Sequence, residues 1–310
     1  MSTDLASEID EMLWFGLDDQ ASSDEEAKAS LAAEVARVSG LKPFPTVASK
    51  VLQELSSEVY SVPKLANLVE SDPSLASLVL RLVNSALHGR GEPVTAVRQA
   101  VVRLGGRRLR DLVVSAATMQ MFHDVKGLGV TIRDHCSITA AIVRVLGQTY
   151  DLTGADSMYL AGLLHDVGKL LLLETREFSY ASLDPKVIMS VDGVHLHERR
   201  QLGYDHAVLG GLVLRAWKIP DPVPQIVAWQ HQPTRAYADG GPIGPQVAVL
   251  RLASRISWYL SETTLPSEEF NSELASSTDG QWVGLQRDHV RDLWTRLVEA
   301  RSDALSAFNG

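Results

Sequence analysis

The hydrophobic pattern of the chain repeats at helical spacing over most of its length. Apolar residues recur three or four positions apart from Val47 to Leu55, and two further apolar stretches start with a polar residue and a proline, at 61–63 and 72–73. A polar cap followed by proline in the first turn is a common start of a helix. The pattern therefore predicts three short helices in succession, after an extended entry at Pro43 and Pro45.

Later parts of the chain show the same period. It predicts helices from about 97 to 104 and from 109 to 122, with a Gly pair between them as cap and turn, and a long final helix over 286–307. We find no internal repeat and no convincing alternation of apolar and polar residues that would indicate strands. The expected fold class is all-α.

The most apolar stretch, 160–173, also contains ionisable residues. His165 and Asp166 follow Leu163 and Leu164 and precede a run of four leucines, 170–173. The stretch has no proline and many good helix formers, so we expect one buried helix. Burying a His and a carboxylate without partners costs on the order of several kcal/mol. Partners must therefore come from distant parts of the chain, and a metal ion is the usual reason to gather such groups.

Composition narrows the possible environments of the protein. The 310 residues are enough for one large domain or two ordinary ones, and the single cysteine, Cys136, cannot form an internal disulfide. The N-terminus does not resemble a signal peptide, and no stretch reaches the roughly 18 apolar residues of a membrane span. We therefore expect a cytoplasmic protein that does not associate with membranes by itself.

The net charge of −9 is concentrated at one end of the chain. Residues 1–26 contain nine acidic side chains and no Lys or Arg; removing these nine from the 38 acidic residues leaves 29, equal to the number of Lys and Arg. The rest of the chain is electrically balanced. We therefore expect no nucleic-acid partner, since the body has no general attraction for phosphate and the acidic arm would repel it.

Two surface features leave alternatives open. An apolar island, 12–17, lies within the acidic segment and is either packed on the body of the protein or a short linear motif for a partner. Arginines 103, 107, 108 and 110 surround the Gly pair, where they form either an anion-binding site at a helix start or a solvated face.

Several motifs occur in a characteristic order between about Lys42 and Ile256: FPTV, SDPSLASLVLRLVNSALHG, AVRQAVVRLGGRRLRDLVVS, LAGLLHDVGKLLL and GYDHAVLGGLVLRAWKIPDPVPQIVAWQHQP. In this order they resemble the HDOD proteins, the "HD-related output domain" family of bacterial signalling proteins. The resemblance implies a multi-helical HD-like bundle with an additional N-terminal helical half. It divides the chain into an acidic, partly flexible arm (1–40), an HDOD domain (41–260, with halves 41–125 and 126–260) and a C-terminal helical extension packed on the domain (261–310).

The resemblance to HD-type phosphohydrolases also implies a set of metal ligands. The matching residues are His135, the pair His165 and Asp166, and the further histidines His206 and His231. The closing Asp of the HD pattern falls at Ser254, whose hydroxyl is a poor substitute for a carboxylate ligand. The remaining donors suit Fe, Mn or Zn, or the site holds no metal.

Two functions follow from this set. The first is a non-catalytic signal-transduction output or regulatory domain that binds a signalling protein or a small phosphate-bearing ligand. The second is a metal-dependent phosphohydrolase acting on a nucleotide or other phosphate ester, with Lys169 as a phosphate contact. A third interpretation overlaps with the first: the His and Asp side chains form a polar network that only holds helices in register. The segment QHQP at 230–233 lacks a Gly-Tyr-Pro signature, which argues against hydrolysis of cyclic di-GMP.

Overall fold

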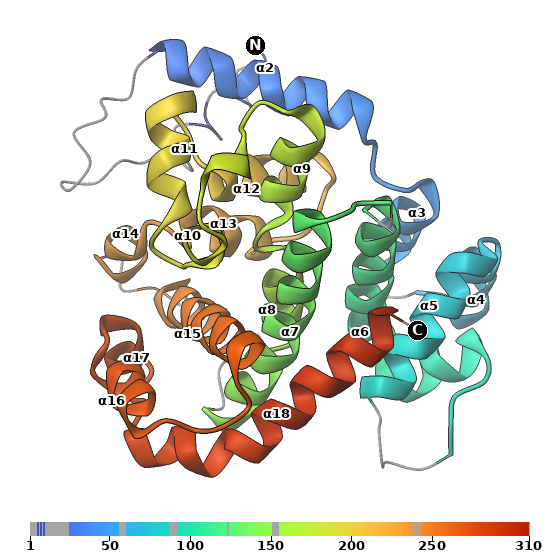
Figure 1. The fold of residues 1–310 in the computed structure, drawn as a ribbon. Helices are drawn as coiled ribbons and strands as arrows, with labels where there is room; N and C mark the ends of the chain where they lie inside the picture. The colour runs from blue at the N-terminus through green and yellow to red at the C-terminus, as the bar shows by residue number, and fades with distance from the viewer. Residues whose placement is uncertain are drawn as a thin grey trace.

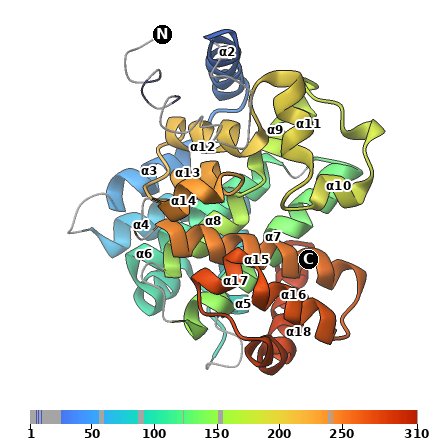
Figure 2. The same ribbon diagram turned by 90° about the vertical axis from the view of Figure 1, so that its left-hand side faces the viewer.

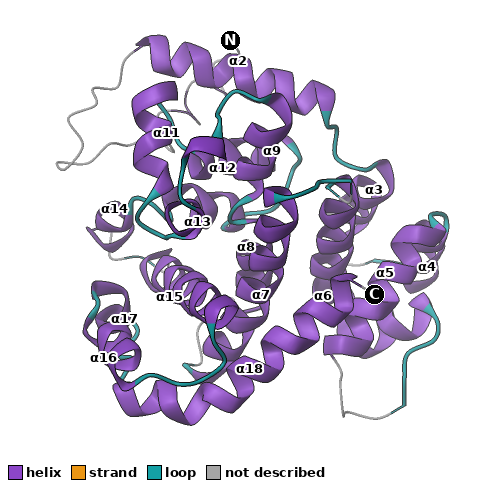
Figure 3. Ribbon diagram, viewed as in Figure 1, coloured by secondary structure: helices purple, strands orange, loops and turns teal. Residues whose placement is uncertain are grey.

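Helices make up the regular structure of the computed structural model. It describes residues 5, 7, 9, 25–55, 60–86, 92–122, 124–150, 155–238, 241 and 243–309. Within these ranges every regular element is helical, with loops between the helices and no strand (Figure 3). The all-α prediction is confirmed. The apolar island at 12–17 lies outside the described residues.

The N-terminal half is a group of helices at the right of Figure 1, beneath the end of a helix that crosses the top of the molecule. The helix at the top is α2 (Glu25–Leu41), and the group beneath its end consists of α3 (Thr46–Leu55), α4 (Val62–Glu70), α5 (Pro73–Ala86) and α6 (Val97–Met121). The predicted caps are present: Ser61 Oγ accepts from the N–H of Lys64, and Asp72 Oδ1 accepts from the N–H of Leu75.

The second half contains the longest buried helix, α7, with shorter helices around it (Figures 1 and 2). Its elements are α7 (Leu128–Thr149), α8 (Ala155–Leu164), α9 (Val167–Thr175), the 3-10 turn η1 (Tyr180–Ser182), α10 (Pro185–Met189), α11 (Val194–Leu202), α12 (His206–Ala216), α13 (Val223–Trp229), α14 (Pro233–Ala238) and α15 (Ile243–Glu262). The chain then continues through α16 (Glu268–Ser276), α17 (Thr278–Trp282) and α18 (Arg287–Asn309).

Helix α18 joins the two halves along the bottom of Figure 1. It packs against α7 of the second half and against α5 of the first. Its buried side chains include Val290, Leu293, Trp294 and Leu297, the apolar stripe that the sequence predicts. The buried apolar residues of both halves and of α18 belong to one continuous cluster. At the opposite side, α2 contacts α12, and its Leu31 and Val35 are buried although residues 1–40 were expected to form a partly flexible arm.

One local prediction needs correction. The stretch 160–173 is not one helix: α8 ends at Leu164 and α9 starts at Val167, and Asp166 is the N-cap residue of α9 with φ −105° and ψ 15°. At the Gly pair, α6 consists of two helical segments that meet at a kink. The kinked residue is Gly105, at φ 75° and ψ 167°, a backbone conformation that favours glycine.

None of the described helices combines the length and the apolar character needed to cross a bilayer.

Candidate metal centre and histidine cluster

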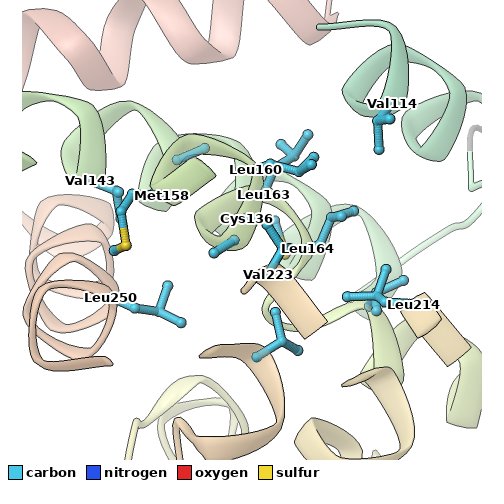
Figure 4. Close-up of a cluster of buried hydrophobic side chains, with 14 of the residues drawn as sticks. Val114, Cys136, Val143, Met158, Leu160, Leu163, Leu164, Leu214, Val223 and Leu250 are labelled. Carbon is cyan, nitrogen blue, oxygen red and sulfur yellow. The ribbon is translucent and has the colours of Figure 1, made fainter. Parts of the chain in front are cut away.

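The break between α8 and α9 places His165 and Asp166 in the interior of the second half. Leu163 and Leu164 at the end of α8 and Cys136 of α7 are buried and belong to the hydrophobic cluster drawn in Figure 4. His165 and Asp166 are each only 1% exposed. At this break the two adjacent polar side chains meet groups from α7, α9 and α12.

Three predicted ligands come together at this break. The donor atoms of His135, from α7, and of His165 and Asp166 all lie within 4.8 Å of one another. His165 Nδ1 donates to the carbonyl of Gly162 at 2.8 Å, which leaves the lone pair of Nε2 for another partner. This buried Nε2 has no hydrogen-bond partner among the described residues.

Asp166 is paired with two cationic groups on its other sides. Its Oδ2 accepts from Lys169 Nζ at 2.8 Å, and its Oδ1 lies 3.2 Å from His206 Nε2. Burial alone would raise the pKa of Asp166, but the His165 ring, the Lys169 ammonium and His206 outweigh it and hold this pKa well below its usual value. Asp166 is therefore ionised and already neutralised by the protein.

His206 is held between two carboxylates. Its Nδ1 donates to Glu198 Oε2 at 2.6 Å, and Tyr180 donates to the other oxygen of Glu198 at 2.6 Å. Burial alone would lower the pKa of His206, but the Glu198 charge and the hydrogen bonds to Asp166 and Glu198 raise it to about 9. The two carboxylates thus favour the protonated, imidazolium form of His206.

The other three histidines of the predicted ligand set have lowered pKa values. Burial, followed by the repulsion that a protonated His165 would exert, lowers the pKa of His135 to about 3, and burial also lowers the pKa of His165 and holds that of His231 well below its usual value. His231 Nε2 lies 3.0 Å from His206 Nε2, so His231 sits behind His206 and not beside His135. His206 therefore contacts Asp166, and His231 contacts His206 on the side away from the donor atoms of His135, His165 and Asp166.

Ser254 lies where the resemblance places the closing carboxylate. Its Oγ is 3.1 Å from His135 Nε2, and Ser257, one turn further along α15, places its Oγ 3.0 Å from His135 Nδ1. Both nitrogens of His135 thus have a serine hydroxyl within hydrogen-bond distance. Neither of these two hydrogen-bond partners of His135 is negatively charged.

The donor set can be tested against a metal. Two histidines and one carboxylate form a ligand set used for Fe, Mn or Zn, and the partnerless Nε2 of His165 fits such an ion. His206 lies between Asp166 and Glu198, which favour its protonated form, and Lys169 shares Asp166 with any incoming cation. The set fits a three-ligand site at His135, His165 and Asp166, with less negative charge than a dication needs.

Several members of the cluster escaped the sequence analysis. His195 stacks on His231 with ring centroids 4.3 Å apart, Glu198 and Tyr180 fix His206, and Gln230 donates to the carbonyl of His165 at 2.6 Å. The segment HLHE at 195–198, just before the predicted His206 helix, was a signal for His195 and Glu198. Tyr180 and Ser257 left no signal, since their roles depend on tertiary contacts alone.

Access to the cluster is restricted. Lys169, expected as a phosphate contact, is 2% exposed and bonded to Asp166. Two cavities of about 620 and 510 Å³ open elsewhere on the described part of the protein, and neither is lined by a histidine. Among the arginines near Gly105, Arg103 donates to the carbonyl of Glu92 and Arg110 pairs with Asp111, while the side chain of Arg107 is outside the description.

An all-helical bundle with a His-Asp pair at a helix break defines the HD-like class of proteins. The HDOD domain model matches residues 41–233, more than half of the chain, and the chain therefore belongs to the HDOD domain family. The predicted family is confirmed.

Solved structures share the fold. A proposed phosphohydrolase from Shewanella amazonensis SB2B is 24% identical, with a TM-score of 0.69 over 90% of this chain and 98% of that one. An HDOD domain protein of unknown function from Geobacter sulfurreducens is 21% identical, with a TM-score of 0.68 over the same shares, 90% and 98%. A proposed signal-transduction protein from Marinobacter aquaeolei VT8 is 21% identical, with a TM-score of 0.60 over 94% and 67%.

One curated relative also matches. It is a protein of Treponema pallidum (strain Nichols), 21% identical over 235 residues, which are 73% of this chain and 44% of the relative. The chain thus spans less than half the length of this relative.

Proposed function

We propose that this chain is a non-catalytic signal-transduction output or regulatory domain of a bacterium, which binds a protein partner or a small ligand through a degenerate HD-type fold. The observation that carries the proposal is the internal neutralisation of Asp166 by Lys169 and His206. A carboxylate paired in this way offers little to a dication, because metal binding would have to compete with two buried cations.

Two further observations support the binding role. Ser254 supplies a hydroxyl where the HD pattern has its last carboxylate, and the paired groups His165, Asp166 and Lys169 are all buried. A phosphate ester would have to reach them through the packed helices around α8 and α9. The family is associated with bacterial signalling, and a proposed signal-transduction protein shares the fold.

A turnover measurement tests the proposal. Purified protein is loaded with Zn²⁺, Mn²⁺ or Fe²⁺ and assayed on p-nitrophenyl phosphate, nucleoside phosphates and phosphodiesters beside His165→Gln, in which Nε2 is no longer available. We expect the same background rate for both proteins with every metal. Metal-dependent hydrolysis by the natural chain that disappears in His165→Gln would reject the non-catalytic role.

The proposed binding of a protein partner or small ligand is tested separately. Affinity purification of the chain from its bacterium, followed by mass spectrometry of proteins and small molecules, should recover a stoichiometric companion. A chain that repeatedly purifies alone, without protein or ligand, would contradict a binding role.

A second function has one observation in its favour. His135, His165 and Asp166 bring their donor atoms within 4.8 Å, with a partnerless nitrogen on His165. A metal held there would supply Lewis-acid activation of a phosphoryl oxygen and of water. A metal-dependent phosphohydrolase is therefore the alternative function. The turnover measurement distinguishes it from the non-catalytic role.

A further inference from the structure

Arg251 is a buried arginine of α15 that contacts three separate segments of the chain. Its Nη1 donates to the carbonyl of Gln230 at 2.6 Å, and its Nη2 donates to Asp192 at 2.8 Å. Its Nε donates to the two carboxylate oxygens of Asp279, at 3.0 and 3.2 Å. Arg251 is 6% exposed and Asp279 is 4% exposed, so they form a buried ion pair. Charge-assisted hydrogen bonds of this kind are strong and restrict geometry.

Gln230 connects this arginine to the histidine cluster. It caps the end of α13, is buried, and donates from Nε2 to the backbone carbonyl of His165 at 2.6 Å. The carbonyl that Arg251 holds and the side chain that contacts His165 thus belong to one residue. A shift of Arg251 therefore moves a group that contacts the break between α8 and α9.

Asp192 provides a weaker connection to the other side of the cluster. It precedes α11, the helix that carries Glu198, but its side chain is 65% exposed. An exposed ion pair contributes little to stability, whereas a buried one is costly to break. The buried pair with Asp279 is therefore the main restraint on the position of Arg251.

The C-terminal extension fixes the position of Asp279. This residue lies in α17, whose N-cap Ser277 accepts from the N–H of Gly280 at 3.0 Å. A Cβ on Gly280 would lie 2.1 Å from the carbonyl oxygen of Leu274 in α16, so a glycine is needed for this close approach of the two helices. Tyr237 also donates to the Asp279 carboxylate. Asp279 is thus held from both α16 and α14.

The contacts continue to the protein surface. Trp282 of α17 is 38% exposed, and its ring stacks on that of Tyr237 with centroids 4.8 Å apart. Asp279 and Trp282 lie in the same short helix, so any displacement of α17 also moves the carboxylate that holds Arg251. The extension thus offers an accessible place from which the surroundings of His165 can be changed.

We propose that the C-terminal extension positions His165 through Arg251: Asp279 holds the arginine, and the arginine holds the residue whose side chain contacts His165. Both Arg251 and Asp279 lie beyond residues 41–233, so these positioning contacts come from outside the region that matches the family model. The role applies to a non-catalytic and to a catalytic cluster alike, because it concerns the place of His165 and not its chemistry.

NMR of the full chain with Asp279→Asn tests the positioning role. Asparagine keeps the shape of the side chain but removes the charge that attracts Arg251. We expect the side-chain amide signals of Gln230 and the ring ¹⁵N signals of His165 to shift from those of the natural chain. The side-chain amide protons of Gln230 should also exchange faster with solvent, since exchange follows local opening.

Glu273→Gln is the matched control. It removes the ion pair between α16 and Arg255, which lies one turn beyond Arg251 on the same helix. The change in charge is the same, but neither residue contacts Gln230 through a described hydrogen bond. The signals of Gln230 and His165 should therefore stay as they are in the natural chain.

Unchanged Gln230 and His165 signals in a folded Asp279→Asn protein would overturn the positioning role, and so would equal shifts in Glu273→Gln. If Asp279→Asn does not fold, Tyr237→Phe decides instead, because it removes only the hydroxyl that donates to Asp279. We then expect smaller shifts of the same signals, and their absence would overturn the role.

Discussion

Ser254 is the residue at which the cluster departs most clearly from a complete HD site. Its hydroxyl lies 3.1 Å from His135 Nε2, where the resemblance predicts a carboxylate. A hydroxyl adds no negative charge, so the nearest unit charge to His135 is that of Asp166, which Lys169 and His206 already neutralise. We therefore expect Ser254 to weaken metal binding in addition to the neutralisation of Asp166.

Replacing this serine tests that explanation. Ser254→Asp returns a carboxylate to the site beside His135, and we expect it to tighten Mn²⁺ or Zn²⁺ binding by at least about tenfold, or about 1.4 kcal/mol. Calorimetric titration with each metal measures the change. Ser254→Asn has nearly the same shape without the charge and should bind metal as weakly as the natural chain; equal affinity in all three proteins would show that Ser254 does not limit binding.

At the scale of elements, the cluster depends on the close approach of α9 and α12. Gly168, in the first turn of α9, lies against the backbone of His206 at the start of α12, and a Cβ on this glycine would lie 1.9 Å from the His206 carbonyl oxygen. No side-chain rotation can relieve a contact with backbone. A glycine is therefore required here to bring Asp166 and His206 together.

Substitution of this glycine should separate the two helices. We expect Gly168→Ala to lower the free energy of unfolding by about 1–3 kcal/mol, since the helices must shift to accommodate the methyl group. Gly40→Ala is the control: a Cβ there meets nothing within 4 Å, and the change should be neutral or stabilise α2 by up to about 1 kcal/mol. Urea unfolding of both variants gives the values, and equal stability of the two would mean that the α9–α12 contact is less tight than described.

Helix positions were predictable from the sequence because they depend on local spacing and caps. Ser61 and Asp72 cap their helices as expected, and the stripe of Val290 and Leu297 is buried. The break at His165 and Asp166 was not predictable in this way. The stretch contains no proline, and the residues at the break have tertiary partners such as His206 and Gln230.

At the scale of the whole molecule, one apolar core encloses a polar cluster whose charges balance. Asp166 and Glu198 are opposed by Lys169 and His206, all of them buried. The family resemblance named His135, His165, His206 and His231, of which His135 and His165 converge with Asp166, and it missed His195, which stacks on His231. It did not predict that His206 is charged, because that depends on Glu198, which approaches from α11 only in the folded protein.

Histidine ¹⁵N NMR of the folded protein tests the charge network of Asp166, Glu198, Lys169 and His206 most directly. A pKa raised to about 9 stabilises the fold fully below the unfolded value near 6.5 and loses this contribution as the pH rises through 9. At about pH 7.5 we therefore predict both nitrogens of His206 protonated, with His135 and His165 neutral. A neutral His206 at this pH, with a free nitrogen lone pair, would contradict the account.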